Sequence, residues 1–134
     1  NVPVSMEDED WELGMIGNRN PNYEDYTSGH PKPLRRQPAS SEVNLAMVNA
    51  IEQSQYGYLF KEGKPSLGHL FMPMKNKWNN GEYIVWQEEQ AVDWMQRTLR
   101  AGGAWTWNVP YHKETSQLNP AAVAFAKRVA SQLR

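Results

Sequence analysis

The acidic residue with the best setting for chemistry is Glu12, which lies between Trp11 and Leu13. Burial beside an aromatic ring raises the pKa of a carboxyl group, and a carboxyl that keeps its proton near neutral pH can act as a general acid. We therefore predict that Glu12 is the catalytic acid/base. Asp10 and Glu24 are weaker candidates. The alternative for Glu12 is a solvated carboxylate at the end of an acidic run.

Three histidines could hydrogen-bond a polar ligand, and each could instead be a structural residue. His30 lies in the loop of residues 27–31, which suits contact with a ligand. His69 falls inside a predicted strand, and His112 follows another. Their scattered positions give no metal-ligand spacing, so we predict no metal site and no cofactor. The sequence also contains no glycine-rich phosphate loop and no Gly-x-Ser-x-Gly elbow.

The chain contains six tryptophans and six tyrosines. Tryptophan is a large apolar plate with one polar group, and it suits cores, interfaces and flat ligands. Trp78 lies in a polar loop without an obvious core partner, so it is a candidate contact for a sugar or a protein partner. Burial in the core is the ordinary alternative for the tryptophans as a group.

Composition argues against several classes of protein. The 14 basic and 15 acidic residues nearly balance, and the densest basic spot is only Arg35-Arg36, so we expect no nucleic-acid partner. No apolar run approaches the roughly 20 residues of a membrane span, and we expect no membrane partner. The absence of cysteine excludes disulfides and cysteine-based zinc sites. No signal peptide is visible, and a secreted or periplasmic location stays open, so the localisation is unknown.

Two parts of a single partial domain differ in pattern. Residues 1–40 predict a strand at 13–16 and a long proline-rich loop over 18–40. Residues 41–134 predict a helix–strand–helix–strand–helix segment, which is typical of a parallel α/β fold. The expected elements are a helix near 42–54, an extended piece with a turn over 56–64, a strand over 67–72 stopped by Pro73, a loop over 75–87, a helix over 88–101 ended by Gly102-Gly103, a strand over 104–109 and a helix over 120–133 begun by Asn119-Pro120.

Residues 94–110, WMQRTLRAGGAWTWNVP, resemble the last barrel strand of α-L-fucosidases and fucosidase-like glycoside hydrolases. In that family a helix ends in a glycine pair, and the next strand closes with Asn-hydrophobic-(Gly)-Pro. The pair Gly102-Gly103 and the triplet of residues 108–110 stand in those places, although the glycine before the proline is absent. Residues 11–17 look like the family's Trp-Glu segment. Residues 66–69 are the nearest match to its serine–tryptophan–glycine–tyrosine motif, without the tryptophan.

The resemblance implies that the chain supplies the C-terminal strand–helix units of a (β/α)8 barrel. Such a barrel typically takes about 250 residues, so the 134-residue chain would be a fragment of it. It also implies a retaining mechanism, in which a nucleophile and an acid/base lie about 5–5.5 Å apart. The family's nucleophilic aspartate lies on an earlier strand, to which nothing in this chain corresponds. We therefore expect the chain alone to be inactive and to need the remaining barrel chain or a partner subunit.

In a barrel, residues at the carboxyl ends of strands line the active site. Side chains alternate along a strand, so Trp105 and Trp107 share one face, and two tryptophans would crowd a barrel interior that smaller branched side chains normally fill. We therefore expect both to pack under the helices, while Thr106 and Asn108 face the barrel axis. Met72 at the end of the preceding strand is a further candidate for the site. With a carbohydrate ligand, the predicted substrate-binding residues are His30, His69, Trp78, Asn108, Tyr111 and His112.

Two other functions stay open at this point. The chain could be a non-catalytic carbohydrate-binding or protein-interaction module in which tryptophans form the platform. It could also be a structural α/β subunit whose aromatic residues all belong to the core.

Overall fold

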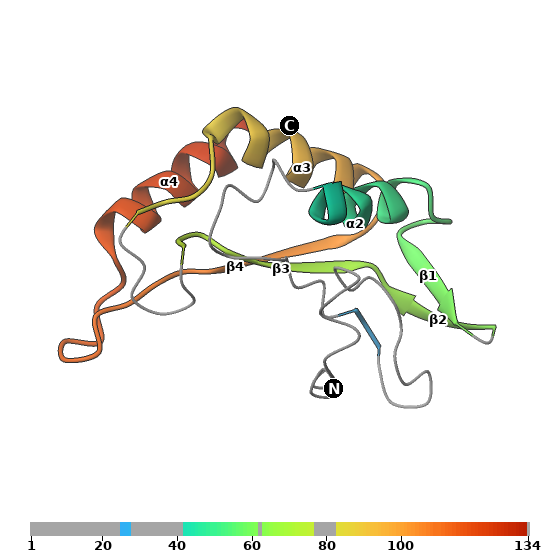
Figure 1. Ribbon diagram of the computed structural model, residues 1–134, viewed down its shortest axis with the longest axis horizontal. Helices are drawn as coiled ribbons and strands as arrows, with labels where there is room; N and C mark the ends of the chain where they lie inside the picture. The colour runs from blue at the N-terminus through green and yellow to red at the C-terminus, as the bar shows by residue number, and fades with distance from the viewer. Residues whose placement is uncertain (1–24, 28–41, 62, 77–82, 134) are drawn as a thin grey trace.

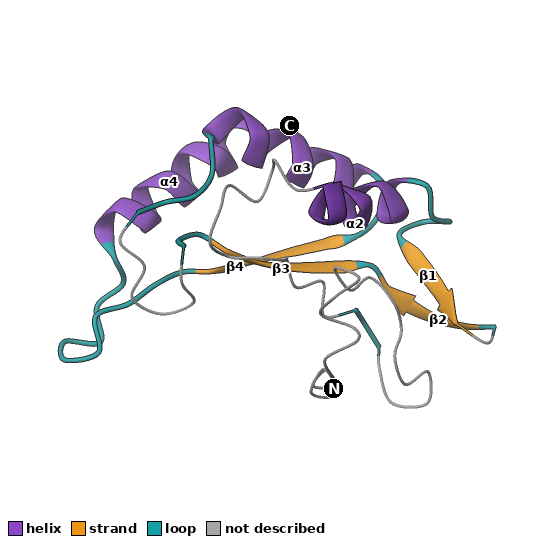
Figure 2. Cartoon of the chain, viewed as in Figure 1, coloured by secondary structure: helices purple, strands orange, loops and turns teal. Residues whose placement is uncertain are grey.

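The computed structural model describes residues 25–27, 42–61, 63–76 and 83–133. Figure 1 shows the described helices together on one side of the strands β3 and β4, and Figure 2 separates the elements by type. The elements in chain order are α2 (Glu42–Glu52), β1 (Tyr58–Lys61), β2 (Lys64–Leu67), β3 (His69–Pro73), α3 (Glu88–Arg100), β4 (Ala104–Asn108) and α4 (Pro120–Gln132).

The strands β3 and β4 run parallel and are joined by α3, which forms a strand–helix–strand unit. Their register pairs His69 with Ala104 and Pro73 with Asn108. Both strands and α3 lie close to where the sequence predicts them, so the parallel α/β expectation is confirmed for this segment. The described strands form two two-stranded sheets, one parallel and one antiparallel. They establish a mixed α/β segment, and the (β/α)8 barrel stays a prediction.

Local signals explain the ends of α3 and α4. The Asn119 side chain accepts a hydrogen bond from the Ala122 backbone N–H at 3.1 Å, and Pro120 follows it at the first helical position. This is the arrangement that caps a helix start and needs no N–H from proline. At the end of α3, Gly102 adopts a φ of 91° and its N–H bonds the Leu99 carbonyl. A positive φ of this size is accessible to glycine with little strain, so the helix stops there.

The hairpin of β1 and β2 goes beyond the single extended piece predicted for residues 56–64. Its strands pair antiparallel, with Tyr58 opposite Leu67 and Lys61 opposite Lys64. The predicted start of the next strand at Leu67 is therefore wrong, because Leu67 belongs to β2. Gly68 lies between β2 and β3, and its N–H donates to the Gly57 carbonyl at 2.7 Å.

Gly68 also has no room for a side chain. A Cβ placed there would lie 2.7 Å from the Ile51 side chain and 2.9 Å from the Gly57 carbonyl oxygen. The close approach of α2 and the hairpin therefore requires glycine at this position. Pro73 was predicted to stop the strand, but it is the last residue of β3.

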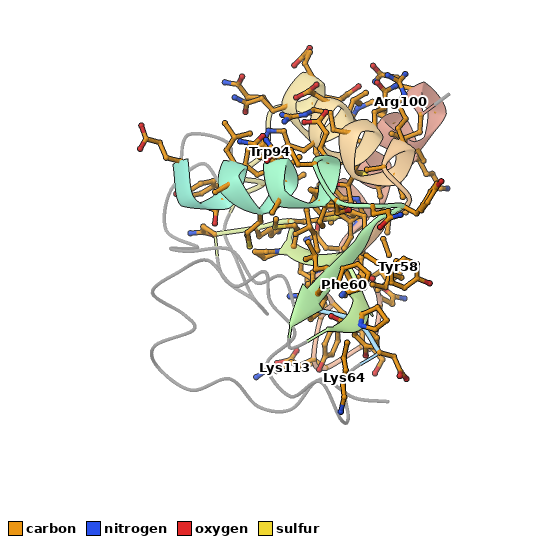
Figure 3. All side chains as sticks on the ribbon, turned by 90° about the vertical axis from the view of Figure 1, so that its right-hand side faces the viewer. Tyr58, Phe60, Lys64, Trp94, Arg100 and Lys113 are labelled. Atoms are coloured by element: carbon orange, nitrogen blue, oxygen red, sulfur yellow. The ribbon has the colours of Figure 1, made fainter. Side chains whose placement is uncertain are left out.

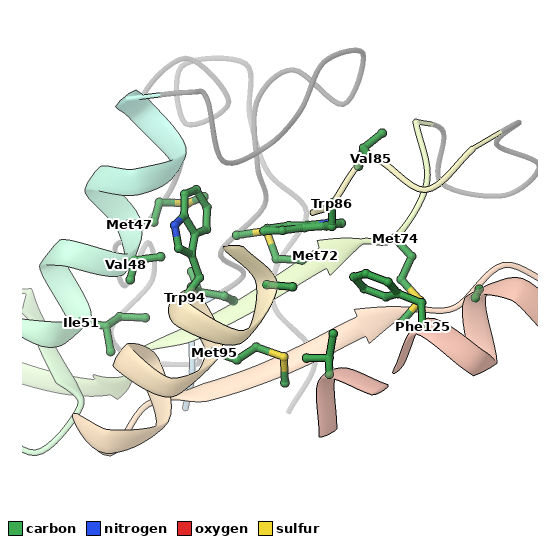
Figure 4. Close-up of a cluster of buried hydrophobic side chains, with 14 residues drawn as sticks. Met47, Val48, Ile51, Met72, Met74, Val85, Trp86, Trp94, Met95 and Phe125 are labelled. Atoms are coloured by element: carbon green, nitrogen blue, oxygen red, sulfur yellow. The ribbon is translucent and has the colours of Figure 1, made fainter. Parts of the chain in front are cut away.

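The core lies between the β3–β4 sheet and the helices (Figure 4). Four tryptophans pack together in and against it, and we call them the tryptophan core: Trp86, Trp94, Trp105 and Trp107. The Trp86 ring meets the rings of Trp94, Trp105 and Trp107 edge to face, with centroids 5.5, 5.7 and 5.2 Å apart. Its indole N–H donates to the Pro73 carbonyl at 2.8 Å. The bond satisfies the single polar group of the Trp86 side chain, which burial would otherwise leave without a partner. Trp107 also meets Phe125 of α4 at 6.0 Å, so the prediction that Trp105 and Trp107 pack under the helices is confirmed.

Exposed ion pairs join the helices at their outer surface. Arg97 of α3 binds Glu52 of α2 at 2.7 Å, and Arg128 of α4 binds Glu88 of α3 at the same distance. The arginines lower the pKa of both carboxyl groups through these hydrogen bonds. Such exposed pairs contribute little stability. In the part of the chain that the structure describes, no helix is long and apolar enough to cross a membrane.

Candidate functional site

The two faces of the β3–β4 sheet carry different side chains. Leu70, Met72, Trp105 and Trp107 pack toward the core. By alternation along the strands, a second set points the other way. We call this second set the opposite face, and it consists of His69, Phe71, Thr106 and Asn108.

His69 is fixed at both ring nitrogens. Its Nδ1 lies 2.9 Å from the Thr27 carbonyl oxygen, and its Nε2 lies 2.9 Å from Thr106 Oγ1. A carbonyl can only accept, so Nδ1 carries the proton, and in the neutral ring Nε2 accepts from the Thr106 hydroxyl. The Thr27 hydroxyl also makes two hydrogen bonds to the His69 backbone. It accepts from the His69 N–H and donates to the His69 carbonyl, each at 2.9 Å.

Burial lowers the pKa of His69, and the hydrogen bond to the Thr27 carbonyl partly opposes this shift. The Tyr26 ring stands edge-on to the imidazole with centroids 5.2 Å apart. The imidazole is therefore neutral at physiological pH and held in one tautomer. Thr106 is exposed. Since its proton points to His69, its oxygen can accept a hydrogen bond from a ligand hydroxyl.

The carboxyl ends of the strands hold a separate group of predicted residues. Asn108 lies level with Pro73, four residues along the sheet from the level of His69, which is about 13 Å at the rise of a strand. Beyond it, residues 110–119 form a loop that extends past the sheet (Figure 1). Tyr111 forms an isolated antiparallel β-bridge with Leu118, and the His112 N–H donates to the Gln117 carbonyl at 2.8 Å. Both Tyr111 and His112 are exposed, so the loop presents them to solvent.

The family described as endo-α(1,4)-fucoidanase Mef1 matches residues 5–134. The chain belongs to this family. It is thus a carbohydrate-active, glycoside-hydrolase-like segment, and the predicted class of hydrolase is confirmed. The narrower α-L-fucosidase activity stays a prediction. No curated protein matched the chain.

Solved structures of endo-fucoidan hydrolases from glycoside hydrolase family 107 share the fold of this segment. MfFcnA4 aligns with a TM-score of 0.71 and 22% identity over 98% of this chain and 20% of its own. P5AFcnA aligns with 0.68 and 18% identity over 90% of this chain and 32% of its own. MfFcnA9 gives 0.62 and 20% identity, covering 85% and 23%. The chain therefore spans between a fifth and a third of the length of these structures.

Within this fucoidanase-family segment, the predicted site residues do not all lie together. Asn108, Tyr111 and His112 lie at or beyond the carboxyl end of β4, whereas His69 begins β3 at its amino end. Met72 is fully buried on the core side, so its prediction as a site residue is wrong. Strand alternation turns it toward the helices. Glu12 and its rivals Asp10 and Glu24, together with His30 and Trp78, lie outside the described residues.

The sequence did not single out Tyr26, Thr27 or Thr106 as partners of His69. Thr27 is 42 residues from His69, and no local pattern signals a contact across that distance. The isolated bridge between Tyr26 and Leu67 brings this segment beside β2 and so beside His69. Thr106 could have been found, because alternation places it on the same face as His69.

Acidic residues are absent from β3 and β4, whose sequences are HLFMP and AWTWN. Among the described carboxylates, Glu52 and Glu88 are engaged by arginines on the helices. Within the described residues, no group of three or more histidine, cysteine or acidic side chains could hold a metal ion. The chemistry that the described sheet offers is therefore hydrogen bonding through histidine, threonine and asparagine.

Proposed function

We propose that the intact protein is an endo-acting fucoidan hydrolase that cleaves α-L-fucosidic bonds by a retaining double displacement. This chain supplies the last strand–helix units of its (β/α)8 barrel, and the nucleophilic carboxylate comes from an earlier strand. The observation that carries the proposal is the match of the endo-α(1,4)-fucoidanase family to residues 5–134. The parallel β3–α3–β4 unit with a polar opposite face supports it.

The described residues would bind the sugar chain. Asn108, at the carboxyl end of β4, would hydrogen-bond a ring hydroxyl next to the scissile bond. Tyr111 and His112 extend from the loop that follows and would contact a neighbouring sugar. Thr106, oriented by His69, lies deeper on the same face. His30 and Trp78 complete the predicted set of substrate contacts.

The proposed reaction needs two carboxyl groups. The nucleophile attacks the anomeric carbon while Glu12 gives its proton to the departing glycosidic oxygen, so that a glycosyl–enzyme ester forms. Glu12 then removes a proton from water, which attacks the same carbon and releases the nucleophile. Two inversions leave the anomeric configuration unchanged.

Product analysis on the intact protein tests this proposal. Fucoidan is incubated with the enzyme, and its size distribution is followed by size-exclusion chromatography. An endo-acting enzyme lowers the mean mass early and releases little free fucose, and proton NMR of the first product shows the retained α-anomer. Release of free fucose alone would indicate an exo-acting α-L-fucosidase. Binding without any cleavage would favour the carbohydrate-binding module.

Glu12 can be tested against a neighbour in the same acidic run. Glu12→Gln should abolish cleavage of fucoidan, while the matched Glu7→Gln variant should keep it. Equal activity of the two variants would remove Glu12 from the proposed mechanism. The unaltered 134-residue chain alone should not cleave aryl α-L-fucosides, because it lacks the proposed nucleophile.

A further inference from the structure

The His69 ring contacts two threonines through hydrogen bonds of different kinds. Its Nδ1 lies 2.9 Å from the Thr27 carbonyl oxygen, which can only accept a hydrogen bond. Its Nε2 lies 2.9 Å from Thr106 Oγ1, and a hydroxyl can either donate or accept. The direction of the Nδ1 bond is therefore fixed, whereas the direction of the Nε2 bond can reverse.

The number of protons on the ring decides the direction of the Nε2 bond. In the neutral ring Nδ1 carries the proton, so Nε2 accepts from the Thr106 hydroxyl. A second proton must bind Nε2, because Nδ1 is already protonated. The Nε2–H and the Thr106 O–H would then be two donors facing each other across 2.9 Å. The hydroxyl must therefore turn, accept from Nε2–H and point its own proton elsewhere.

The backbone around the ring has contacts that do not change with the proton on Nε2. The Thr27 hydroxyl accepts from the His69 N–H and donates to the His69 carbonyl, each at 2.9 Å. Thr27 is 1% exposed, and the parallel bridge between Tyr26 and Leu67 holds its segment beside the end of β2. Protonation can therefore reverse one hydrogen bond without any movement of the strands.

We infer that His69 and Thr106 form a pH-dependent hydrogen-bond switch. When His69 is neutral, Thr106 donates to the ring and presents only oxygen lone pairs to its surroundings. When His69 is protonated, Thr106 accepts from the ring and presents its O–H as a donor. A hydrogen-bonding partner of Thr106 thus meets an acceptor at higher pH and a donor at lower pH. The switch is independent of the proposed function, because both states follow from contacts among the described residues.

Few charged groups surround the ring among the described residues. β3 and β4 contain no other charged or titratable side chain. The segment beside β3 contributes Asp25, which is exposed, and Tyr26, whose ring stands edge-on to the imidazole at 5.2 Å. β2 begins with Lys64, whose side chain points away from the helices (Figure 3). Burial lowers the pKa of His69, so the reversal should occur below the ordinary histidine value of about 6.5.

Nitrogen and proton NMR of the intact protein with isotope-labelled histidine tests the switch, with His69→Gln to assign the signals. Thr106→Val keeps the shape of the side chain and removes the hydroxyl. Above the pKa of His69, this variant should move the bare Nε2 signal downfield, because the nitrogen loses a donor. Below the pKa, it should move the Nε2–H proton signal upfield, because that proton loses an acceptor. The Nδ1–H signal should stay unchanged, and Thr106→Ser should restore both Nε2 signals.

Three outcomes would overturn the switch. A proton on Nε2 of the neutral ring would contradict the tautomer that the Thr27 carbonyl imposes. An effect of Thr106→Val in only one of the two pH ranges would show that the bond does not reverse. Unfolding before His69 takes up its proton, monitored by circular dichroism, would show that the second state is not reached. His112 is exposed and serves as the internal control, since Thr106→Val should leave its signals unchanged. If Thr106→Val fails to fold, Thr106→Ala gives the same comparison.

Discussion

The two faces of the β3–β4 sheet differ in what fills them and in what they are suited to do. The core side holds Trp105 and Trp107 against Trp86 and the helices. The opposite face holds His69 and Thr106, joined by a hydrogen bond at 2.9 Å. Side chains from the same two strands thus serve packing on one side and hydrogen bonding on the other. Substitutions on the core side should therefore change stability, whereas substitutions on the opposite face should change hydrogen bonding.

The largest effect should come from the core side. Trp107→Ala removes a ring that meets Trp86, Trp105 and Phe125, and should lower the free energy of unfolding by about 3–5 kcal/mol, as large-to-small core substitutions do. Urea denaturation of the intact protein measures the change. The matched control is Thr106→Ala on the opposite face, where the exposed side chain should cost less than about 1 kcal/mol. Similar losses in the two variants would contradict the division between the faces.

A smaller effect is expected at the start of α4, which holds Phe125 over the core side. Asn119→Ala removes the side-chain oxygen that accepts from the Ala122 N–H, and should lower the free energy of unfolding by about 1 kcal/mol. Asn119→Asp keeps an acceptor at this position and should restore most of the loss. Thermal unfolding of the intact protein compares the variants. If Asn119→Ala and Asn119→Asp unfold at the same temperature, the side-chain cap contributes nothing to stability.

His69, on the opposite face, should make the free energy of unfolding depend on pH. The pKa of folded His69 is lowered, mainly by burial, so between this value and the ordinary one the unfolded chain binds more protons. The contribution of His69 to stability is therefore fully present above the ordinary histidine pKa. It is lost as the pH falls from there through the lowered pKa of the folded state. Unfolding of the intact protein is measured from about pH 7.5 to about pH 5. His69→Gln should remove part of the decline, and an identical slope in both proteins would count against this environment for His69.

The smallest effect on stability, with a large effect on function, is expected for Asn108. Asn108→Ala should lower the free energy of unfolding by less than about 1 kcal/mol, because the side chain lies outside the tryptophan core. Cleavage of fucoidan by the intact protein should nevertheless fall about ten-fold or more, the scale of a lost hydrogen bond to substrate. Asn108→Asp keeps the shape and one acceptor and serves as the control. Full activity of the alanine variant would place the substrate elsewhere.

Several features followed from the sequence because their causes are local. Asn119-Pro120 and the glycine pair after Arg100 fix where α4 begins and α3 ends, since capping and a positive φ depend on neighbouring residues only. Alternation in β4 puts Trp105 and Trp107 on one face, and their size predicts that this face packs under the helices. The hydrolase class rested on the residues around Gly102-Gly103 and Asn108, and the family match supports that class.

Tertiary structure alone decided which distant groups meet. Trp86 falls in a stretch predicted only as loop, yet it is 6% exposed at the centre of the tryptophan core. His69 gains its fixed tautomer from Thr27, which is 42 residues away. Position 68 requires glycine because Ile51 of α2 packs closely against it. Leu67, predicted to begin the strand over 67–72, pairs with Tyr58 and belongs to β2. The contacts of Trp86 and of His69 join segments outside any local window, and propensity and periodicity carry no information about such contacts.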